Sequence, residues 1–487
     1  MSMSIVQYFG NQLSKCGYCS GTNCSKSHGM HAYSMRCQDY QDLIDRGWRR
    51  CGNYCYKLRN EDTCCPCYTI KCDALEFKLT KSNKRILRRM SRYLRDGKRE
   101  SGSGNGGDGD GDADDAALHG EVNASEPQPQ LPDKSPAVIN VEQVASLVEA
   151  QKKPNPVAKP SPPAATGPSA PPPTLGTNKS AAPISNAPRK KAKQMRLERR
   201  QAKLGDLAPP PPTKPGSQEK GLRDFISSAS ESDKHKLQIT LVASSDIERT
   251  CADEVLALYR KYQLVVHNDN PARLTLASMQ RFLVKSPLKN EKPIDGPEMG
   301  YGSFHQQYWL DDKLIAVGVI DILPGSVSSV YFFYDPEYSF LSLGTYGSLR
   351  EIDFVQTIAE SVPSLKYYYM GFYIHSCPKM RYKGKLSASY LLCPETYVWL
   401  SLTDAIRSKL DENKYQRLNP DDSARDVNEF LMEHLDEVML LLDSKTFTDY
   451  KHYLKIVGQD KERDTIVEYS RLVGKDCARR MLYVNMS

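Results

Sequence analysis

The fold of this chain is decided by residues 302–334, which form three consecutive runs: Gly302-Ser-Phe-His-Gln-Gln-Tyr-Trp-Leu310, Lys313-Leu-Ile-Ala-Val-Gly-Val-Ile-Asp-Ile-Leu323 and Val327-Ser-Ser-Val-Tyr-Phe-Phe-Tyr334. All three are rich in β-branched and aromatic residues, and Asp311-Asp312 makes a turn between the first two. In the first run Phe304, Tyr308 and Leu310 share one face, as the two-residue period of a strand requires, with Gln306 as the exception. The stretch therefore predicts three strands in quick succession.

Further helices and strands are expected on both sides of this stretch. Before it, the pattern predicts a strand at residues 236–243 and helices at 253–262 and 275–283. After it come a Ser/Gly-rich loop at 341–348, a helix at 349–360 and a strand at 366–375. The order β-β-β-loop-α-β favours an α+β fold of the acyltransferase kind over a doubly wound sheet.

Four parts are expected along the chain. Residues 1–99 are rich in cysteine, residues 100–220 form a linker, residues 221–403 hold the α+β pattern, and residues 404–487 are expected to be helical. Within the last part, residues 421–443 carry apolar side chains at helical spacing, which predicts a packing face.

The linker is expected to be disordered. It contains a Gly/Asp run near residue 105, Pro-, Ala- and Ser-rich sequence, and four consecutive prolines from Pro209. Such a composition buries too little apolar surface to offset the entropy of ordering. A basic run between Arg189 and Arg200 has three readings: a nuclear-localisation signal, an RNA-contacting arm or a solubilising charge run.

Cysteine is concentrated near the start of the chain. Ten of the 14 cysteines precede residue 73, and four make a spaced set, Cys16-Gly-Tyr-Cys19 and the adjacent pair Cys64-Cys65. The first residues lack the charged-then-apolar pattern of a secretion signal, so we expect a reducing compartment, where thiolates bind metal. The set predicts a zinc ion or an iron–sulfur cluster, with free structural thiols as the alternative.

The loop at residues 341–348 is a candidate anion site. A strand that leads through a glycine-rich loop into a helix directs backbone N–H groups and the positive helix end at an anion. The predicted binding residues are Ser342, Gly344, Tyr346, Gly347, Ser348 and Arg350. N-acetyltransferases bind the pyrophosphate of acetyl-CoA here with a Gln/Arg-x-x-Gly-x-Gly/Ala pattern. Leu341 and Tyr346 do not fit that pattern, so acetyl-CoA is not expected; an ordinary helix-entry loop is the other reading.

Aromatic residues and cations crowd together in residues 367–385. Tyr367-Tyr-Tyr-Met-Gly-Phe-Tyr leads into a segment with four cations, Lys379, Arg381, Lys383 and Lys385. A surface that stacks bases and neutralises phosphates has this composition. A core strand explains the aromatics equally well, and we expect His375 and Cys377 to be core residues at its end.

The chain resembles the eukaryotic arginyl-tRNA–protein transferase family. The resemblance rests on the four cysteines together with several longer motifs in the same order: Tyr40-Gln-Asp-Leu-Ile-Asp-Arg-Gly-Trp-Arg-Arg50, Gly302-Ser-Phe-His-Gln-Gln-Tyr-Trp309, Ser328-Ser-Val-Tyr-Phe-Phe-Tyr-Asp-Pro336 and Tyr369-Met-Gly-Phe-Tyr-Ile-His-Ser-Cys-Pro-Lys-Met-Arg-Tyr-Lys-Gly384. It covers the first hundred residues and nearly all of the chain after residue 233. It implies a catalytic domain similar to N-acetyltransferases, joined to the cysteine-rich domain, whose Cys16, Cys19, Cys64 and Cys65 hold zinc or an iron–sulfur cluster.

The resemblance implies transfer of arginine from arginyl-tRNA to the α-amine of proteins that begin with Asp, Glu or oxidised Cys, which marks them for ubiquitin-dependent degradation. An amine attacking an activated ester needs no strong base, because its pKa is about 8. We expect Asp321 to bind or deprotonate the amine, with His305 and Glu351 as further candidates. The cations at 379–385 are expected to recognise the acidic residue or to hold the tRNA acceptor stem.

Two other classes stay open at this point: an acetyl-CoA-dependent acetyltransferase and a non-catalytic RNA-binding metalloprotein. No run of eighteen apolar residues exists, so no membrane span is expected. The net charge of +7 does not by itself imply nucleic acid. We expect a monomer in the cytoplasm, with the nucleus as a second location.

Overall fold

The computed structural model describes residues 3–99, 135–151, 220–227, 230–443, 446–459 and 461–485. Met1–Lys152 and Lys220–Ser487 group into one compact unit. The basic run from Arg189 and most of the expected linker lie outside the described residues.

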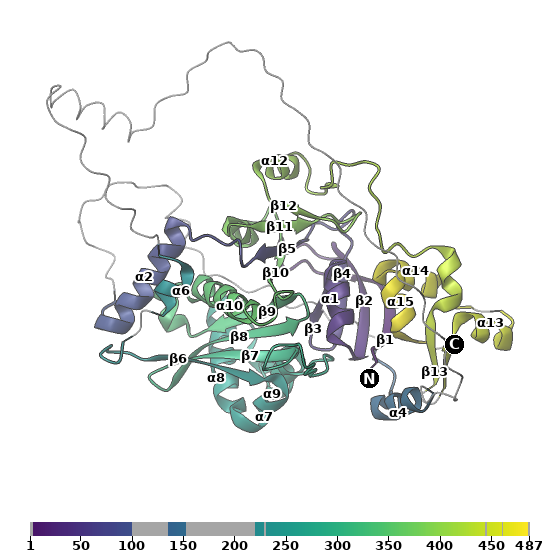
Figure 1. The fold of residues 1–487 in the computed structure, drawn as a ribbon, viewed down its shortest axis with the longest axis horizontal. Coiled ribbons are helices and arrows are strands. Elements are labelled where there is room, and N and C mark those ends of the chain that lie inside the picture. The colour runs from purple at the N-terminus through teal and green to yellow at the C-terminus, as the bar shows by residue number, and fades with distance from the viewer. Residues whose placement is uncertain are drawn as a thin grey trace, which may run out of the picture. The chain divides into compact units, whose positions relative to one another are not determined.

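An eight-stranded sheet forms the larger layer of this unit (Figure 1). Its strand order is β12-β11-β5-β10-β9-β8-β7-β6. The bounds are β12 Trp399–Ser401, β11 Ser389–Leu392, β5 Tyr68–Asp73, β10 Tyr367–Tyr373, β9 Ser326–Tyr334, β8 Lys313–Leu323, β7 Gly302–Leu310 and β6 Leu237–Ala243. All the strands predicted between residues 236 and 375 are confirmed.

Helices cover both faces of β7, β8 and β9, which explains why β8 is buried along almost its whole length. Helix α8, Ala252–Tyr262, places Tyr259 edge-on to Phe333, with ring centroids 5.8 Å apart. Helix α10, Leu343–Ala359, covers the opposite face, where Phe332 lies against Gly347 (Figure 1). Phe332 and Phe333 therefore belong to two separate core layers.

Strands β9 and β10 form the parallel pair of this sheet, and they pair only at their beginnings. Tyr367, Tyr368 and Tyr369 align with Ser326, Val327 and Ser328. Beyond these residues β9 continues its ladder with β8, and β10 continues with β5. The two strands thus separate toward their carboxyl ends.

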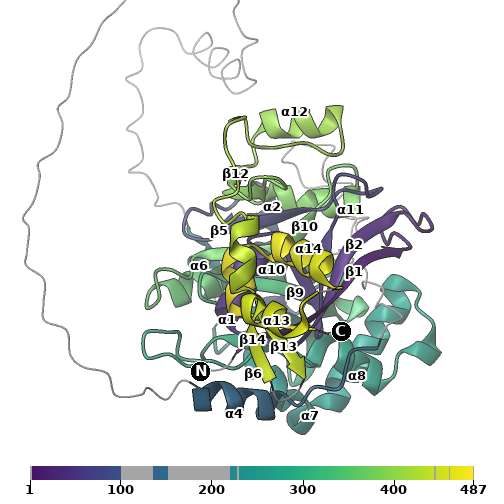
Figure 2. The same ribbon diagram turned by 90° about the vertical axis from the view of Figure 1, so that its right-hand side faces the viewer.

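A seven-stranded sheet makes the second layer, in the order β14-β13-β15-β1-β2-β4-β3. Its bounds are β14 Thr446–Asp449, β13 Met439–Asp443, β15 Leu482–Val484, β1 Ile5–Ser14, β2 Ser25–Ser34, β4 Tyr54–Leu58 and β3 Trp48–Cys51. Strand β1 pairs in parallel with β15, and helix α14, Arg463–Val473, packs against β1 (Figure 2).

Both sheets combine strands from the two ends of the sequence. Strand β5 lies between β10 and β11 in the larger sheet, and β1 pairs with β15 in the smaller one. Residues 1–99 therefore do not form a self-contained domain of the kind expected from their cysteine content. The outer bounds at 220 and 403 stay predictions.

The remaining helices are α1 Cys37–Ile44, α2 Lys81–Asp96, α4 Val141–Gln151, α6 Leu222–Ile226, α7 Ile247–Thr250, α9 Leu276–Met279, α11 Pro378–Arg381, α12 Asp404–Glu412, α13 Tyr450–Val457 and α15 Lys475–Arg480. No described helix is long and apolar enough to cross a membrane.

Helix α4 corrects the prediction of disorder for part of the linker. Val144 and Val148 are fully or almost fully buried against Ile5, Leu441 and Leu482 of the smaller sheet. Val141, Val144 and Val148 recur at helical spacing, a local pattern that the average composition of residues 100–220 hides.

The helix expected at residues 421–443 is also wrong. This segment contains a short 3₁₀ turn, Met432–Glu437, and then strand β13. Val427, at 90% exposed, does not belong to a packing face. For a short apolar run such as β13, local composition does not distinguish a helix from a strand. The hydrogen-bonded pairing with β14 and β15 makes this run a strand.

Candidate functional site

The four predicted cysteines come together. The Sγ atoms of Cys16, Cys19, Cys64 and Cys65 all lie within 4.8 Å of one another. A tight turn holds the first pair, because the Cys16 amide donates to the Gly21 carbonyl at 2.9 Å. The second pair is held by the Cys64 amide, which donates to the carbonyl of Cys24 at 3.0 Å. The prediction of a possible metal-binding group is confirmed.

The sulfur spacing fits a single tetrahedral ion. Zn–S bonds of about 2.3 Å place the sulfurs of a tetrahedron about 3.8 Å apart, and Cys19 Sγ lies 3.6 Å from Cys64 Sγ. The Gly21 backbone lowers the pKa of Cys19 to about 6, which favours the thiolate that metals bind. Burial raises the pKa of Cys65 to about 12, so its deprotonation requires a neighbouring cation.

The cysteine cluster packs against the end of strand β10. Cys16, Cys65 and Cys67 share a small apolar cluster with Phe372 and Ile374, and with Met380 of α11. The cysteine cluster therefore supports residues 379–385, the segment that carries the four predicted cations.

Asp321 does not lie in an accessible site. It is fully buried in β8 and forms an ion pair with Arg50 of β3, and the Ser303 hydroxyl donates to it at 2.7 Å. Its carboxylate joins the two sheets and has no room for an incoming amine. The geometry argues against the role expected for Asp321 and gives it a structural one.

His305 and Glu351 are buried as well. The His305 ring bonds to the Leu283 carbonyl at 3.1 Å, and burial lowers its pKa to about 4. Glu351 lies on the buried face of α10 and accepts a hydrogen bond from the Tyr368 hydroxyl at 2.6 Å. Burial raises the pKa of Glu351 to about 7. Neither group lines a described cavity.

The expected anion-binding loop is mostly the first turns of α10. The helix begins at Leu343, and Tyr346 and Gly347 are buried within it, so their backbone groups bond along the helix. Gly347 fits because a side chain there would collide with Phe332. Gly344, Ser348 and Arg350 are half-buried in α10, which leaves Ser342 at the helix start, where Arg89 donates to its hydroxyl at 3.1 Å.

The four cations of residues 379–385 separate. Lys379 is exposed, whereas Lys383 is buried. Arg381 and Lys385 line a cavity of about 640 Å³ with Arg407 and Asp411, and this cavity is positively charged overall. His375 also lines it, and it is held between the Tyr373 hydroxyl at 2.6 Å and the Asp411 carboxylate at 2.7 Å. The cations thus do not form one common pocket.

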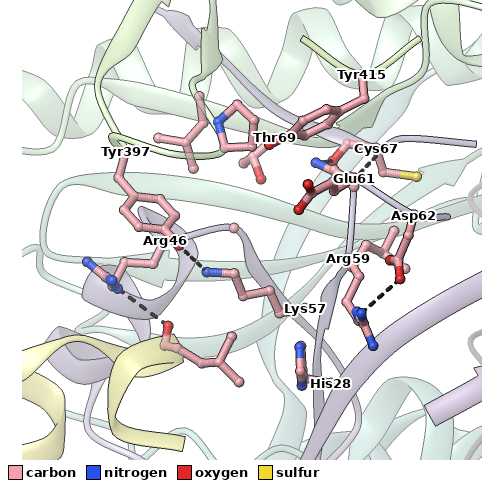
Figure 3. A pocket seen from close by; sticks show the side chains of 16 residues that line it. His28, Arg46, Lys57, Arg59, Glu61, Asp62, Cys67, Thr69, Tyr397 and Tyr415 are labelled. Carbon is pink, nitrogen blue, oxygen red and sulfur yellow. Dashed lines mark hydrogen bonds and ion pairs between the residues drawn. The ribbon is translucent and has the colours of Figure 1, made fainter. Parts of the chain in front are cut away.

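A second cavity, of about 550 Å³, was not predicted from the sequence (Figure 3). Strand β4 contributes Lys57, the following loop contributes Arg59, Glu61 and Asp62, and the loop after β11 contributes Tyr397. Tyr397 lies more than 330 positions from the other residues, so no local sequence pattern predicts that they meet. One feature marks the place: Tyr397 has a φ of 54°, which is rare for an aromatic residue.

Tyr397 and Lys57 are electrostatically coupled. The Lys57 ammonium donates to the Tyr397 hydroxyl at 2.7 Å, and the Arg46 guanidinium stacks 4.2 Å from the ring centroid. Burial lowers the pKa of Lys57. Burial alone would raise the pKa of Tyr397, but Lys57 and Arg46 outweigh it and lower the value.

Helix α2 presents a strongly basic face. Its apolar side, including Ile86, Leu87 and Met90, is buried, and Thr80 caps its start. The opposite side lines a groove of about 440 Å³ with six cations, Lys81, Lys84, Arg85, Arg88, Arg89 and Arg92. This is the highest concentration of positive charge in the described cavities.

Comparison with known proteins agrees with these features. Residues 14–85 match the family model described as "Arginine-tRNA-protein transferase, N terminus", and residues 254–393 match "Arginine-tRNA-protein transferase, C terminus". A solved C-terminal domain of a putative lysylphosphatidylglycerol synthetase from Agrobacterium fabrum covers 37% of this chain and 41% of its own, with 12% identity and a TM-score of 0.17, too low to support any conclusion.

Two relatives that align with most of this chain are named arginyl-tRNA--protein transferase, and a third, shorter match is a leucyltransferase. Arginyl-tRNA--protein transferase 1 of Drosophila melanogaster is 69% identical, over 99% of this chain and 100% of its own. Arginyl-tRNA--protein transferase 1 of Arabidopsis thaliana is 35% identical, over 85% of this chain and 75% of its own. An aspartate/glutamate leucyltransferase of Campylobacter jejuni is 31% identical, over 29% of this chain and 53% of its own. The chain therefore belongs to the arginyl-tRNA–protein transferase family of enzymes.

Proposed function

We propose that this enzyme transfers arginine from arginyl-tRNA to the α-amine of proteins that begin with Asp, Glu or oxidised Cys. The amine nitrogen attacks the ester carbonyl carbon, a C–N bond forms, and the C–O bond to the terminal ribose breaks. The nitrogen loses one proton and the leaving ribose oxygen gains one. The product carries a new N-terminal arginine, and we propose that it is thereby marked for ubiquitin-dependent degradation.

The full-length match carries this proposal. The Drosophila relative is named for transfer from arginyl-tRNA to protein, and it aligns with 99% of this chain. The Campylobacter relative is named for aspartate and glutamate, which supports an acidic acceptor. Both matched segments contribute strands to the larger sheet, so the two family regions act as one unit here.

The separating strands support an N-acetyltransferase-like catalytic region. In that arrangement, two parallel strands connected by a helix separate to admit the acyl donor. Here β9 leads into α10 and then into β10, and the two strands pair only at their first three residues. Acetyl-CoA is not expected as a cofactor, since the pattern that binds its pyrophosphate is absent from residues 341–346.

Two basic surfaces support tRNA as the donor. The groove of α2 carries six cations. The cavity beside His375 adds Arg381, Lys385 and Arg407 and contains several serines. Cations at this density suit a phosphate backbone. We therefore assign the exposed cations of residues 379–385 to the tRNA, the second of the two roles expected for them.

Holding both substrates in place supplies most of the rate in this proposal. An α-amine with a pKa of about 8 is partly neutral at physiological pH, so a weak acceptor suffices for its proton. A strong base is therefore not needed, which agrees with the burial of Asp321 and His305 and with their contacts to Arg50 and to the Leu283 carbonyl.

The cysteine cluster is proposed to hold zinc or an iron–sulfur cluster. The spacing of the four sulfurs supports a single ion, because a multi-iron cluster would hold them farther apart. Such an ion would fix the loop between β4 and β5. We also propose that the protein is a monomer and that it acts in the cytoplasm, with the nucleus as a second location.

A transfer assay tests the proposed function. The metal-loaded full chain is incubated with tRNA charged with labelled arginine and with peptides that begin with Asp or Ala. We expect label in the Asp peptide and little in the Ala peptide. Label in neither peptide, with folded protein and intact arginyl-tRNA, would refute the proposal.

A further inference from the structure

We infer that the cavity of Figure 3 is the acceptor site and that it binds the zwitterionic head of an acidic N-terminal residue, with the side-chain carboxylate at Lys57 and Tyr397 and the α-ammonium at Glu61. This inference rests on the proposed function, because it takes the acceptor to be a protein that begins with Asp or Glu.

The cavity presents charges of both signs, as a zwitterion does. Arg46, Lys57 and Arg59 bring three positive charges. The carboxylates of Glu61 and Asp62 bring two negative charges. Two charges just outside the lining cancel each other: Asp426, which pairs with Arg46 at 2.7 Å, and Lys26, which pairs with Asp62 at 3.3 Å. The groove of α2 has six cations and no carboxylate, and the cavity beside His375 has three cations and one carboxylate, so both suit a polyanion better. A head group with one carboxylate and one ammonium leaves the balance of this cavity unchanged.

Lys57 and Tyr397 form the side for the carboxylate. Arg46 and Arg59 already have carboxylate partners in Asp426 and Asp62. No carboxylate of the described residues lies within ion-pair distance of the Lys57 ammonium, which donates to the Tyr397 hydroxyl oxygen. Because that oxygen accepts from Lys57, the hydroxyl proton of Tyr397 is free to donate. Two donors thus converge where an anion is missing.

His28 offers a further, neutral acceptor in the cavity, on the opposite side of Lys57 from Glu61. It is 9% exposed, and its Nδ1 lies 2.7 Å from the Tyr8 hydroxyl. That hydroxyl donates to Glu468 at 2.9 Å, so the hydrogen bond to the ring must come from Nδ1–H. Burial lowers the pKa of His28 to about 4, and the ring is therefore neutral. Its Nε2 is then an acceptor without a partner among the described residues.

Glu61 forms the side for the ammonium. Figure 3 shows its carboxylate on one side of Lys57 and Arg59 and His28 on the other side. Glu61 is exposed, and it forms no ion pair within the described part of the chain. An ammonium has three N–H donors, and the two oxygens of the Glu61 carboxylate can accept two of them. The third position stays open toward the cavity.

Peptide binding, measured without tRNA, tests the site. Fluorescent peptides of one sequence that begin with Asp or with Asn differ in charge and hardly in shape, and anisotropy gives their Kd values with the metal-loaded full chain. We expect the wild type to prefer Asp. Lys57→Met should weaken the Asp peptide about tenfold or more and leave the Asn peptide unchanged. Lys451→Met, on exposed α13, is the matched control and should keep the preference.

Two further variants guard against a folding defect in Lys57→Met. Tyr397→Phe removes one hydroxyl and should reduce the preference for Asp a few-fold. Glu61→Gln, on the exposed loop, should weaken the binding of both peptides about equally. For peptides whose α-amine is acetylated, Glu61→Gln and wild type should have the same Kd. An unchanged preference for Asp in folded Lys57→Met or in Tyr397→Phe would overturn the inference.

The two proposals fail separately. Tight, Lys57-dependent binding of the Asp peptide without arginine transfer would refute the proposed function and leave the site standing. Arginine transfer with a preference for Asp that is indifferent to Lys57 and Tyr397 would refute the site and leave the proposed function standing.

Discussion

Arg50 and Asp321 show how a residue can look catalytic in the sequence and be structural in the fold. Asp321 comes near the end of a strand, where carboxylates of active sites are common. The pattern within 302–334 contains no sign of Arg50, which lies about 270 positions away and neutralises it. Local sequence predicts the strand that carries Asp321, but the partner of a buried charge depends on the tertiary fold.

Breaking this ion pair should destabilise the protein without a specific effect on substrate binding. Removing one partner of a buried pair typically costs about 3–5 kcal/mol, because the other charge is left buried alone. We expect Asp321→Asn to lower the free energy of unfolding by about this amount, measured by urea denaturation. Asp353→Asn, at a more exposed pair with Arg223, is the control and should cost less than about 1 kcal/mol. Equal costs for the two variants would contradict the structural role.

Glu351 predicts a pH dependence of stability. Burial raises its pKa to about 7, above the usual value of 4.5. Between these values the unfolded chain has lost the proton and the folded chain keeps it, so this group lowers stability as pH rises from about 4.5 to 7. Glu351→Gln should therefore stabilise the protein by about 1–3 kcal/mol at pH 8 and have little effect below pH 4.5.

The measurement is urea denaturation of Glu351→Gln and wild type across this range. Glu254→Gln, on the exposed side of α8, is the control and should show no such dependence. A stabilisation by Glu351→Gln that does not change with pH would show that Glu351 is ionised throughout.

At the scale of elements, the strands of the larger sheet were predictable because their β-branched and aromatic content is unambiguous. The start of α10 was not, since Gly344, Gly347 and the serines around them are typical of loops. Packing decides that case: only a residue without a side chain fits beside Phe332, and Gly347 supplies it inside a helix. The glycine marks a close contact between helix and sheet and not a cradle for phosphate.

Helix α2 should govern affinity for tRNA. Replacing Arg88 and Arg92 with Gln should weaken arginyl-tRNA binding, because each lost phosphate contact reduces the number of counterions released. Titrations at several salt concentrations should show a shallower dependence of log Kd on log salt, by about 0.7–0.9 per lost contact. Kd for an Asp peptide should not change. The paired control, Lys451→Gln with Lys455→Gln on α13, should leave the salt dependence unaltered.

An unchanged salt dependence in the α2 variant would contradict this role. In that case the cavity beside His375, with Arg381, Lys385 and Arg407, would be the remaining basic surface among those described.

On the scale of the whole molecule, the cysteine cluster and the acceptor cavity share one loop. Residues 59–67 connect β4 to β5, carry Cys64 and Cys65, and place Glu61 and Asp62 at the cavity. Asn60 links the two ends of this loop through hydrogen bonds with the backbone of Cys67 at 2.9 and 3.0 Å. The spacing of the four cysteines was predictable from the sequence, because a Cys-x-x-Cys turn is local. That the loop carrying Cys64 and Cys65 lines one cavity with Tyr397 was not predictable, because the two segments are distant in the sequence.

Removing the metal should therefore act on the acceptor more than on the donor. We expect chelation, or Cys64→Ser, to lower the melting temperature and to weaken binding of an Asp peptide several-fold. Arginyl-tRNA affinity should change less, since α2 lies outside this loop. Cys251→Ser, at a buried cysteine away from the cluster, is the control for loss of a thiol. Equal loss of both affinities after chelation would contradict a local effect.

The central claim is that this chain forms a peptide bond between arginine and an acidic N-terminus. Fragmentation mass spectrometry of an Asp-starting peptide after incubation with arginyl-tRNA tests it most directly. The account predicts one added arginine on the α-amine, and none on the same peptide with an acetylated N-terminus. An unmodified Asp peptide, or arginine attached elsewhere than at the α-amine, would contradict it.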